Sequence, residues 1–268
     1  MTTIQTSVGR IGLTEAGNGS AIPILFLHGV GSDKRVWHPQ VAHFGRTRRT
    51  IAIDYPGYGE SEANAVATRD DFARGALATL DALGIERVHI CGLSLGGVVA
   101  IATHALAPAR CASLILADSF AVHPDGPAIH DRSVAASHVT PMRKLAQARA
   151  PLLLGVMASD DIKAEVIATM GAIDPVAYRL GAAAVWLADQ CDRVAAIDVP
   201  TLVLVGEEDG ITPPALSHAL ARLTGSVAPI PPRVTVHTIA HAGHLANLEQ
   251  PAAFNAAIDR FLAGMETT

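Results

Sequence analysis

The stretch ICGLSLGGVVA, residues 90–100, places Ser94 between Gly92 and Gly96, with Gly97 directly behind. A serine in this G-x-S-x-G spacing is either a small residue in a packed corner or a nucleophile exposed on a sharp strand-to-helix turn. Chance alone produces such a match roughly 0.1 times in a chain of this composition. Whether Ser94 is a nucleophile therefore depends on the partners that the rest of the chain supplies.

Apolar runs recur along the chain, and each is bounded by Gly, Pro, Asp or His. They lie at 23–29, 50–57, 88–94, 113–119, 201–209 and 234–244. Their hydrophobicity is continuous rather than alternating, which is typical of parallel strands covered on both faces. Helical patterns lie between them at 70–84, 96–108 and 251–264. This alternation predicts an α/β fold, a mostly parallel central sheet flanked by helices. An antiparallel hairpin at the sheet edge is expected from segments 3–8 and 10–15.

One long interval interrupts the alternation of strands and helices. Residues 121–198 contain no strand pattern, and helices are expected to begin at Ser159 and at Asp174-Pro175. We therefore expect a helical lid, inserted between the sixth and seventh strands, over a core formed by residues 1–120 and 199–268. Since no repeat or linker-like segment separates the two parts, the lid is expected to belong to the same domain.

A serine hydroxyl becomes a nucleophile when a base removes its proton and a third group orients that base. The chain supplies an acid and a histidine, each after a later strand. Asp209 follows the run 201–206 within GEEDGITPP, and His244 follows the last strand within HAGHLANLEQP. The order Ser, Asp, His, together with the turn at Ser94, predicts a triad of Ser94, Asp209 and His244.

Other residues compete for the acid and for the histidine. Glu207 and Glu208 are adjacent to Asp209, and Asp118 ends the run 113–119, so each remains an alternative for the acid. His241 lies three residues before His244, a spacing that suits two metal ligands on a helix. Because this segment is a loop without a clustered third ligand, we expect no metal site.

A hydrolytic serine also needs two N–H donors for the negative charge that develops on the substrate oxygen. We expect one from Leu95, at the start of the helix behind Ser94, and one from Val30 in the loop LHGVGSDKRVW. His28 is expected mainly to hold that turn by a hydrogen bond. The candidate substrate-binding residues are His28, Gly29, Trp186, Arg132 and Arg143. The arginines are included because arginine binds carboxylates bidentately. Further candidate partners for a substrate carboxylate are Lys144, Arg149, Arg179 and Arg193.

Composition restricts the classes of function. Half of the residues are apolar, 17% are charged and the formal net charge is −5, which disfavours a nucleic-acid surface. No segment approaches 18 uninterrupted apolar residues and none has the pattern of a secretory signal. Cys91, Cys111 and Cys191 are too few and too separated for a disulfide framework or a cysteine zinc site. We expect a cytoplasmic protein that acts on a small molecule without a cofactor, at no membrane; the sequence does not set its oligomeric state.

The motifs FLHGVGSDKRVW, IAIDYPGYGES, GLSLGG, PTLVLVGEEDGITPP and HAGHLANLEQPAAF occur in this order. In this respect the chain resembles α/β-hydrolases over essentially its whole length. The segments VPTLVLVGEEDGITPPALSHAL and GHLANLEQPAAFNAAIDRFL are similar to those of the 3-oxoadipate enol-lactonase group. The resemblance implies the α/β-hydrolase fold and cofactor-free cleavage of a carboxylic ester or lactone, in the catabolism of aromatic compounds for that group.

Three other functions remain open at this point. A general carboxylesterase and a C–C bond hydrolase of ring-cleavage products would use the same triad. A non-catalytic receptor for a small ligand could also keep it. A haloalkane dehalogenase is disfavoured, because its nucleophile would be an aspartate where this chain has Ser94.

Overall fold

The computed structural model describes residues 2–64 and 66–266, whose strands form one seven-stranded sheet. The strands are β1 (Thr2–Thr6), β2 (Gly9–Leu27), β3 (Arg48–Ile53), β4 (Val88–Leu93), β5 (Cys111–Ala117), β6 (Thr201–Gly206) and β7 (Val234–Ile239). Their order is β1-β2-β4-β5-β6-β7, with β3 paired to β2. β1 pairs antiparallel with β2, as predicted, and β4 to β7 pair in parallel. The predicted α/β-hydrolase architecture, a mostly parallel sheet flanked by helices, is confirmed.

The long strand β2 accounts for one error in the predicted strand count. Segments 10–15 and 23–29 are expected as separate strands, but 10–15 and 23–27 belong to this single strand, both halves of which pair with β3. Leu13 and Ala16 lie opposite Ile53 and Thr50, whereas Ile24 and Leu27 lie opposite Thr50 and Ile53. The helical insertion is present, but it lies between the fifth and sixth strands, β5 and β6, not between the sixth and seventh.

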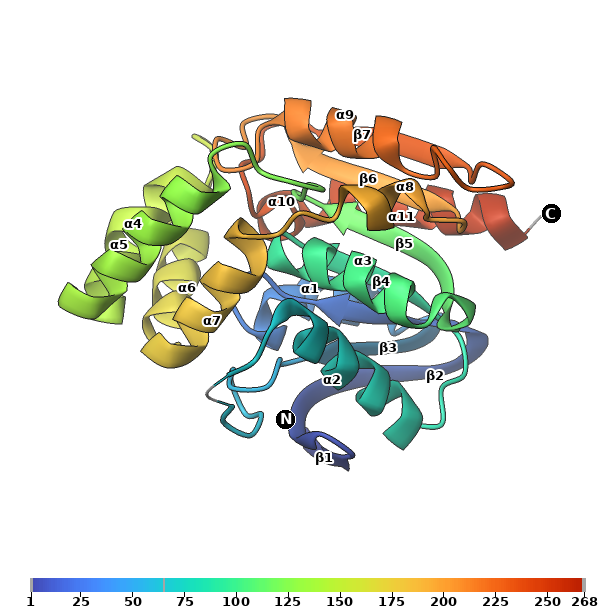
Figure 1. Cartoon of the computed structure of the whole chain (residues 1–268), viewed down its shortest axis with the longest axis horizontal. Helices are drawn as coiled ribbons and strands as arrows, with labels where there is room; N and C mark the ends of the chain where they lie inside the picture. Colours follow the sequence, from blue (N-terminus) through green and yellow to red (C-terminus); the bar gives the residue numbers. More distant parts are fainter. Residues whose placement is uncertain (1, 65, 267–268) are drawn as a thin grey trace.

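Alternate residues of the central strands face opposite helical layers, which explains their continuous hydrophobicity. Leu25 and Leu27 belong to the cluster packed with α2 (Arg69–Ala82) and α3 (Leu95–Leu106). Ile24 and Phe26 belong to the cluster packed with α1 (His38–Phe44) and α11 (Pro251–Glu266). Figure 1 shows helices on both sides of the sheet. The remaining core helices are η1 (Lys34–Trp37), η2 (Pro108–Arg110), α9 (Pro214–Leu223) and α10 (Ala246–Glu249).

The inserted helices lie at one end of the sheet, on the left of Figure 1. They are α4 (Gly126–Val139), α5 (Met142–Leu153), α6 (Asp160–Gly171) and α7 (Pro175–Trp186). The insertion ends in the short α8 (Cys191–Ala195), which lies beside α3 and α9 instead. Ser159 caps α6 by accepting a hydrogen bond from the Ile162 N–H, and Asp174 caps α7 through the N–H groups of Val176 and Ala177. Both predicted helix starts are therefore correct, because side-chain caps satisfy otherwise unpaired N–H groups.

Candidate active site

Ser94 lies on a strained turn between β4 and α3. Its φ of 55° and ψ of −113° place a residue with a side chain in a backbone region that usually favours glycine. Such strain costs of the order of 1–3 kcal/mol and persists only where packing enforces it. At Gly96 an added Cβ would overlap the Leu27 carbonyl oxygen, so strand and helix approach too closely for any other residue. The predicted sharp turn is present, and it holds Ser94 at the carboxyl end of the sheet.

His244 and Asp209 form a buried pair after β7 and β6. The Nδ1 atom of His244 lies 2.9 Å from Asp209 Oδ2. Thr212 donates its hydroxyl to the same oxygen at 2.6 Å, and the N–H groups of Ile211 and Thr212 donate to Oδ1 at 2.8 and 2.9 Å. Burial opposes ionisation, but the charge and hydrogen bond of His244 and the bonds of Thr212 lower the pKa of Asp209. The ionised carboxylate is therefore fixed against one ring nitrogen of His244.

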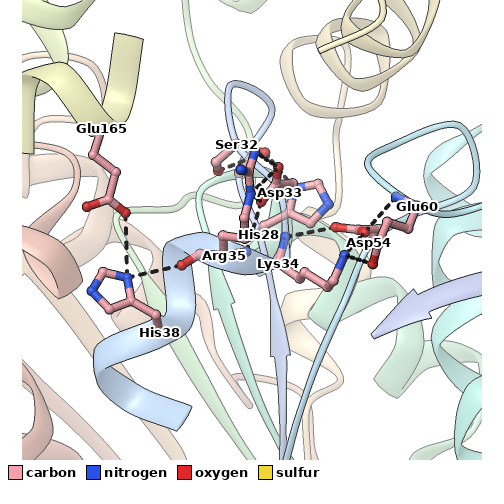
Figure 2. Close-up of polar contacts among 10 residues, drawn as sticks. His28, Ser32, Asp33, Lys34, Arg35, His38, Asp54, Glu60 and Glu165 are labelled. Atoms are coloured by element: carbon pink, nitrogen blue, oxygen red, sulfur yellow. Dashed lines mark hydrogen bonds and ion pairs between the residues drawn. The ribbon is translucent and has the colours of Figure 1, made fainter. Parts of the chain in front are cut away.

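Ser94 and His244 line one cavity beneath the inserted helices. Most of its wall is apolar and comes from both the core and the insertion, through Leu153, Met170, Tyr178, Trp186, Leu245 and Leu248. Two charged side chains, Arg149 of α5 and Glu165 of α6, also line it. Glu165 lies 3.5 Å from His38 Nδ1 (Figure 2). An enclosed apolar space with few polar groups suits a small organic molecule.

The loop after β2 places Val30, the second expected donor, at this cavity. Val30 lines the cavity, and a Cβ on Gly29 would lie 3.5 Å from the Ser94 Cβ. The Gly29 carbonyl, in the same peptide group as the Val30 N–H, accepts from the Ser32 N–H at 3.2 Å and contacts His28 Nδ1 at 2.8 Å. Since N–H and C=O of a trans peptide point in opposite directions, these contacts turn the Val30 N–H away from them.

His28 is fully buried below the loop, as expected for a residue that holds the turn. Burial lowers the pKa of His28 and keeps its ring neutral. The Tyr55 N–H donates to His28 Nε2 at 3.4 Å, so Nδ1 carries the proton and donates to the Gly29 carbonyl. Leu95, the other expected donor, is the first residue of α3, where the backbone N–H groups of a helix are free.

A buried ion cluster ties this loop to the segment after β3 (Figure 2). Lys34 Nζ lies 2.5 Å from Asp54 Oδ2 and 2.9 Å from Glu60 Oε2. Asp54 also accepts from the backbone N–H groups of Lys34 and Glu60, at 2.9 and 3.0 Å. Burial opposes the charge of Lys34, but the bonds to Asp54 and Glu60 raise its pKa. Glu60 is partly exposed, but Asp54 is fully buried, so removing Lys34 would leave the Asp54 carboxylate as an unpaired buried charge; this pair therefore fixes the loop.

The alternative acids have other partners. Asp118 is fully buried and accepts from the Gly206 N–H at 2.8 Å. Burial, and next the charge of Asp209, raise the pKa of Asp118 well above its usual range, so the neutral form is favoured. Glu207 accepts from the His241 N–H at 3.2 Å, and Glu208 from the Val156 N–H at 2.8 Å. The carboxylate that contacts His244 is that of Asp209.

The predicted substrate-binding residues divide into three groups. Gly29 and Trp186 line the cavity together with Val30. Arg132 lines an adjoining depression, which shares Arg149, Trp186 and Ile211 with the cavity. Arg143 is exposed on α5 and is not among the described residues that line the cavity. Sequence reasoning did not single out Arg149 from the other basic residues, because nothing local distinguishes it.

Thr212 was missed in the sequence, although a signal exists. An aspartate in a turn bonds the backbone N–H groups that follow it, which brings a hydroxyl three residues later close to the carboxylate; here the pair lies within DGIT.

Among residues 2–64 and 66–266, no helix is long and apolar enough to cross a membrane. Over the same described residues, no cluster of three or more His, Cys, Asp or Glu side chains could hold a metal ion.

Comparison with known proteins agrees with this fold. The chain is 27% identical over 240 residues to 3-oxoadipate enol-lactonase 1 of Acinetobacter baylyi, a match that covers 89% of this chain and 87% of that protein. The enol-lactonase of Burkholderia xenovorans LB400 superposes with a TM-score of 0.86 at 25% identity, over 98% of this chain and 100% of that chain. A thermophilic esterase of Thermogutta terrifontis, solved with malate bound, gives a TM-score of 0.87 at 27% identity, over 98% of both chains. The model of the Alpha/beta hydrolase family matches residues 24–257. The chain therefore belongs to the alpha/beta hydrolase family.

Proposed function

We propose that the protein is a cofactor-free serine hydrolase that cleaves a carboxylic ester or lactone through an acyl-enzyme. His244 lines the same cavity as Ser94, and its Nδ1 contacts the buried Asp209 carboxylate at 2.9 Å; this arrangement carries the proposal. Asp209 fixes the tautomer in which Nδ1 bears the proton, so Nε2 is free to act as a base.

The reaction then follows from these groups. Ser94 Oγ attacks the substrate carbonyl while His244 Nε2 takes its proton, and the N–H groups of Val30 and Leu95 bind the oxyanion. His244 returns the proton to the leaving oxygen, which frees an alcohol or, from a lactone, opens the ring. A water that loses its proton to His244 then attacks the acyl carbon, and the carboxylic acid and Ser94 are released.

The fine specificity that we propose is for an enol-lactone such as 3-oxoadipate enol-lactone, as in the catabolism of aromatic compounds. Support comes from the two enol-lactonases among the relatives and from the enclosed apolar cavity. When an enol-lactone is cleaved, the leaving group is an enolate, which needs less help from a proton donor than an alkoxide does. A general carboxylesterase is the second candidate, favoured by the likeness to the Thermogutta esterase.

A substrate panel tests the proposal. We expect p-nitrophenyl butyrate and a muconolactone-derived enol-lactone to turn over with kcat of roughly 1 s⁻¹ or more, and a vinylogous diketone acid, a C–C hydrolase substrate, to remain intact. Release of p-nitrophenol and loss of lactone absorbance measure the rates. Preference for the diketone acid would make the protein a C–C hydrolase. Labelling by a fluorophosphonate without turnover of any ester or lactone would indicate a receptor.

Arg149 gives a second prediction, about the acyl side of the substrate. It is the one Lys or Arg among the described residues that line the cavity, and its Nη1 lies 3.5 Å from Ser133 Oγ. A charge-assisted bond to a substrate carboxylate would contribute about 1.5–3 kcal/mol. We therefore expect Arg149→Met to raise KM for a p-nitrophenyl hemisuccinate by about tenfold or more, with less than about a twofold change for p-nitrophenyl butyrate.

Arg143→Met is the matched control, because Arg143 is an exposed arginine of the same helix. Its KM for both esters should equal that of the wild type. Equal effects of Arg149→Met on the charged and the neutral ester would show that Arg149 only packs against the cavity. A rise in KM for the hemisuccinate alone in Arg143→Met would instead support Arg143 as the residue that binds the substrate carboxylate.

A further inference from the structure

The peptide group that follows Val30 is held by a side chain outside the proposed triad. Tyr58, in the loop after β3, donates its hydroxyl to the Val30 carbonyl at 3.3 Å. Tyr58 is 1% exposed, and burial raises its pKa, so the hydroxyl keeps the proton that it donates. His28 fixes the peptide group before Val30, and Tyr58 fixes the one after it. The backbone on both sides of the proposed oxyanion donor is thus restrained by buried side chains.

The inserted helix α7 rests on this contact at Gly181. A Cβ at Gly181 would overlap the Tyr58 hydroxyl and would lie 3.0 Å from Val30 Cγ2 and 3.2 Å from Tyr58 Cζ. Glycine destabilises a helix interior relative to alanine, so its presence in the middle of α7 matches this close approach. Helix α7 also supplies Tyr178 and Trp186 to the cavity wall. One helix therefore both encloses the substrate space and covers the Tyr58–Val30 bond.

We propose that Tyr58 is a positioning residue for the oxyanion donor of Val30. We also propose that the close packing of α7 at Gly181 keeps the Tyr58 hydroxyl bonded to the Val30 carbonyl. The inference rests on the proposed function, since it takes the Val30 N–H as a donor to the oxyanion. Tyr58 contacts neither Ser94 nor the substrate in this scheme; it acts through the Val30 backbone. With α7 in place, the Tyr58 hydroxyl stays directed at the Val30 carbonyl, and the loop keeps the geometry that binds the tetrahedral intermediate better than the substrate.

Tyr58→Phe removes the hydroxyl and keeps the ring. We expect kcat on p-nitrophenyl butyrate to fall roughly tenfold with KM unchanged, less than the hundredfold or more that follows loss of a donor itself. Phenylboronic acid forms a tetrahedral adduct with Ser94, in which a boronate oxygen takes the place of the oxyanion. Its inhibition constant should rise by the same factor. A residue that only supports the fold would lower the thermal midpoint without this selective loss of affinity for the tetrahedral adduct.

Gly181→Ala tests the coupling. In the wild-type background the new Cβ displaces the hydroxyl, so we expect a similar tenfold loss of kcat. In the Tyr58→Phe background the overlap with the hydroxyl is removed. The contacts that remain, 3.0 Å to Val30 Cγ2 and 3.2 Å to the ring Cζ, need only small shifts of these side-chain atoms, so the same substitution should cost less than about threefold. Ala183→Gly, on the same helix, is the control for helix propensity, and it should leave kcat and the boronic acid constant unchanged.

The outcomes separate this inference from the proposed function. Wild-type kcat and boronic acid affinity in Tyr58→Phe, with Ser94→Ala inactive, would overturn the role of Tyr58 and leave the function intact. If the loss of kcat in the double variant equalled the product of the losses in Tyr58→Phe and Gly181→Ala, the coupling would be overturned. If thermal unfolding shows that Tyr58→Phe does not fold, Gly181→Ala and its boronic acid constant decide the matter. A wild-type protein that hydrolyses no ester or lactone would instead overturn the proposed function.

Discussion

Ser94→Ala is expected to lower kcat on p-nitrophenyl butyrate by roughly 10⁴- to 10⁶-fold, because no other group takes over the attack on the carbonyl. The residual rate would come from substrate binding and the oxyanion donors alone. The substitution removes one oxygen from a side chain that is 2% exposed and leaves the strained turn in place, since Gly92, Gly96 and Gly97 still allow the close packing around it. We therefore expect the folded state and its thermal midpoint to be retained.

Ser217→Ala is the matched control for this experiment. Ser217 is a buried serine of α9 that is not among the described residues that line the cavity, and its Oγ has no hydrogen-bond partner among the described residues. Mass spectrometry after fluorophosphonate treatment should find the adduct on Ser94 in the wild type and in Ser217→Ala, and on no serine in Ser94→Ala. Activity of Ser94→Ala within about tenfold of the wild type would remove the proposed mechanism.

The parts of the site that the sequence predicted are those that depend on local signals. The turn at Ser94 is visible because Gly92 and Gly96 are required by sterics within a few residues. Asp209 and His244 could be placed because the carboxyl ends of parallel strands meet at one edge of the sheet. The starts of α6 and α7 were also predictable from local signals, because Ser159 and Asp174 cap the helices that directly follow them.

The parts that the sequence did not predict depend on contacts between distant segments. The two halves of β2 share one partner strand, a pairing that no local pattern reveals. Arg149 lines the cavity while Arg143, on the same helix, does not, and only the packing of α5 against its neighbours separates them. The contact of Gly181 with Tyr58 joins residues far apart in the chain, so the glycine had no visible reason in the sequence.

Asp209→Asn is expected to lower kcat by roughly 10³- to 10⁴-fold while the protein remains folded. An asparagine Oδ1 can still accept from the N–H groups of Ile211 and Thr212, which holds the loop. Its amide, however, would face His244 Nδ1 and donate a hydrogen bond there. The imidazole would then carry its proton on Nε2, where it cannot accept the proton of Ser94.

Asp118→Asn distinguishes the two buried carboxyl groups near His244. Burial and the charge of Asp209 already favour the neutral form of Asp118, and an asparagine is neutral and can accept from the Gly206 N–H in the same way. We therefore expect kcat of Asp118→Asn within about threefold of the wild type, measured with the same ester and alongside the thermal midpoint of each variant. A larger loss in Asp118→Asn than in Asp209→Asn would move the role of the acid to Asp118. Because Asp209 is the one carboxylate that contacts His244 in the part of the chain that the structure describes, the opposite order follows from the geometry.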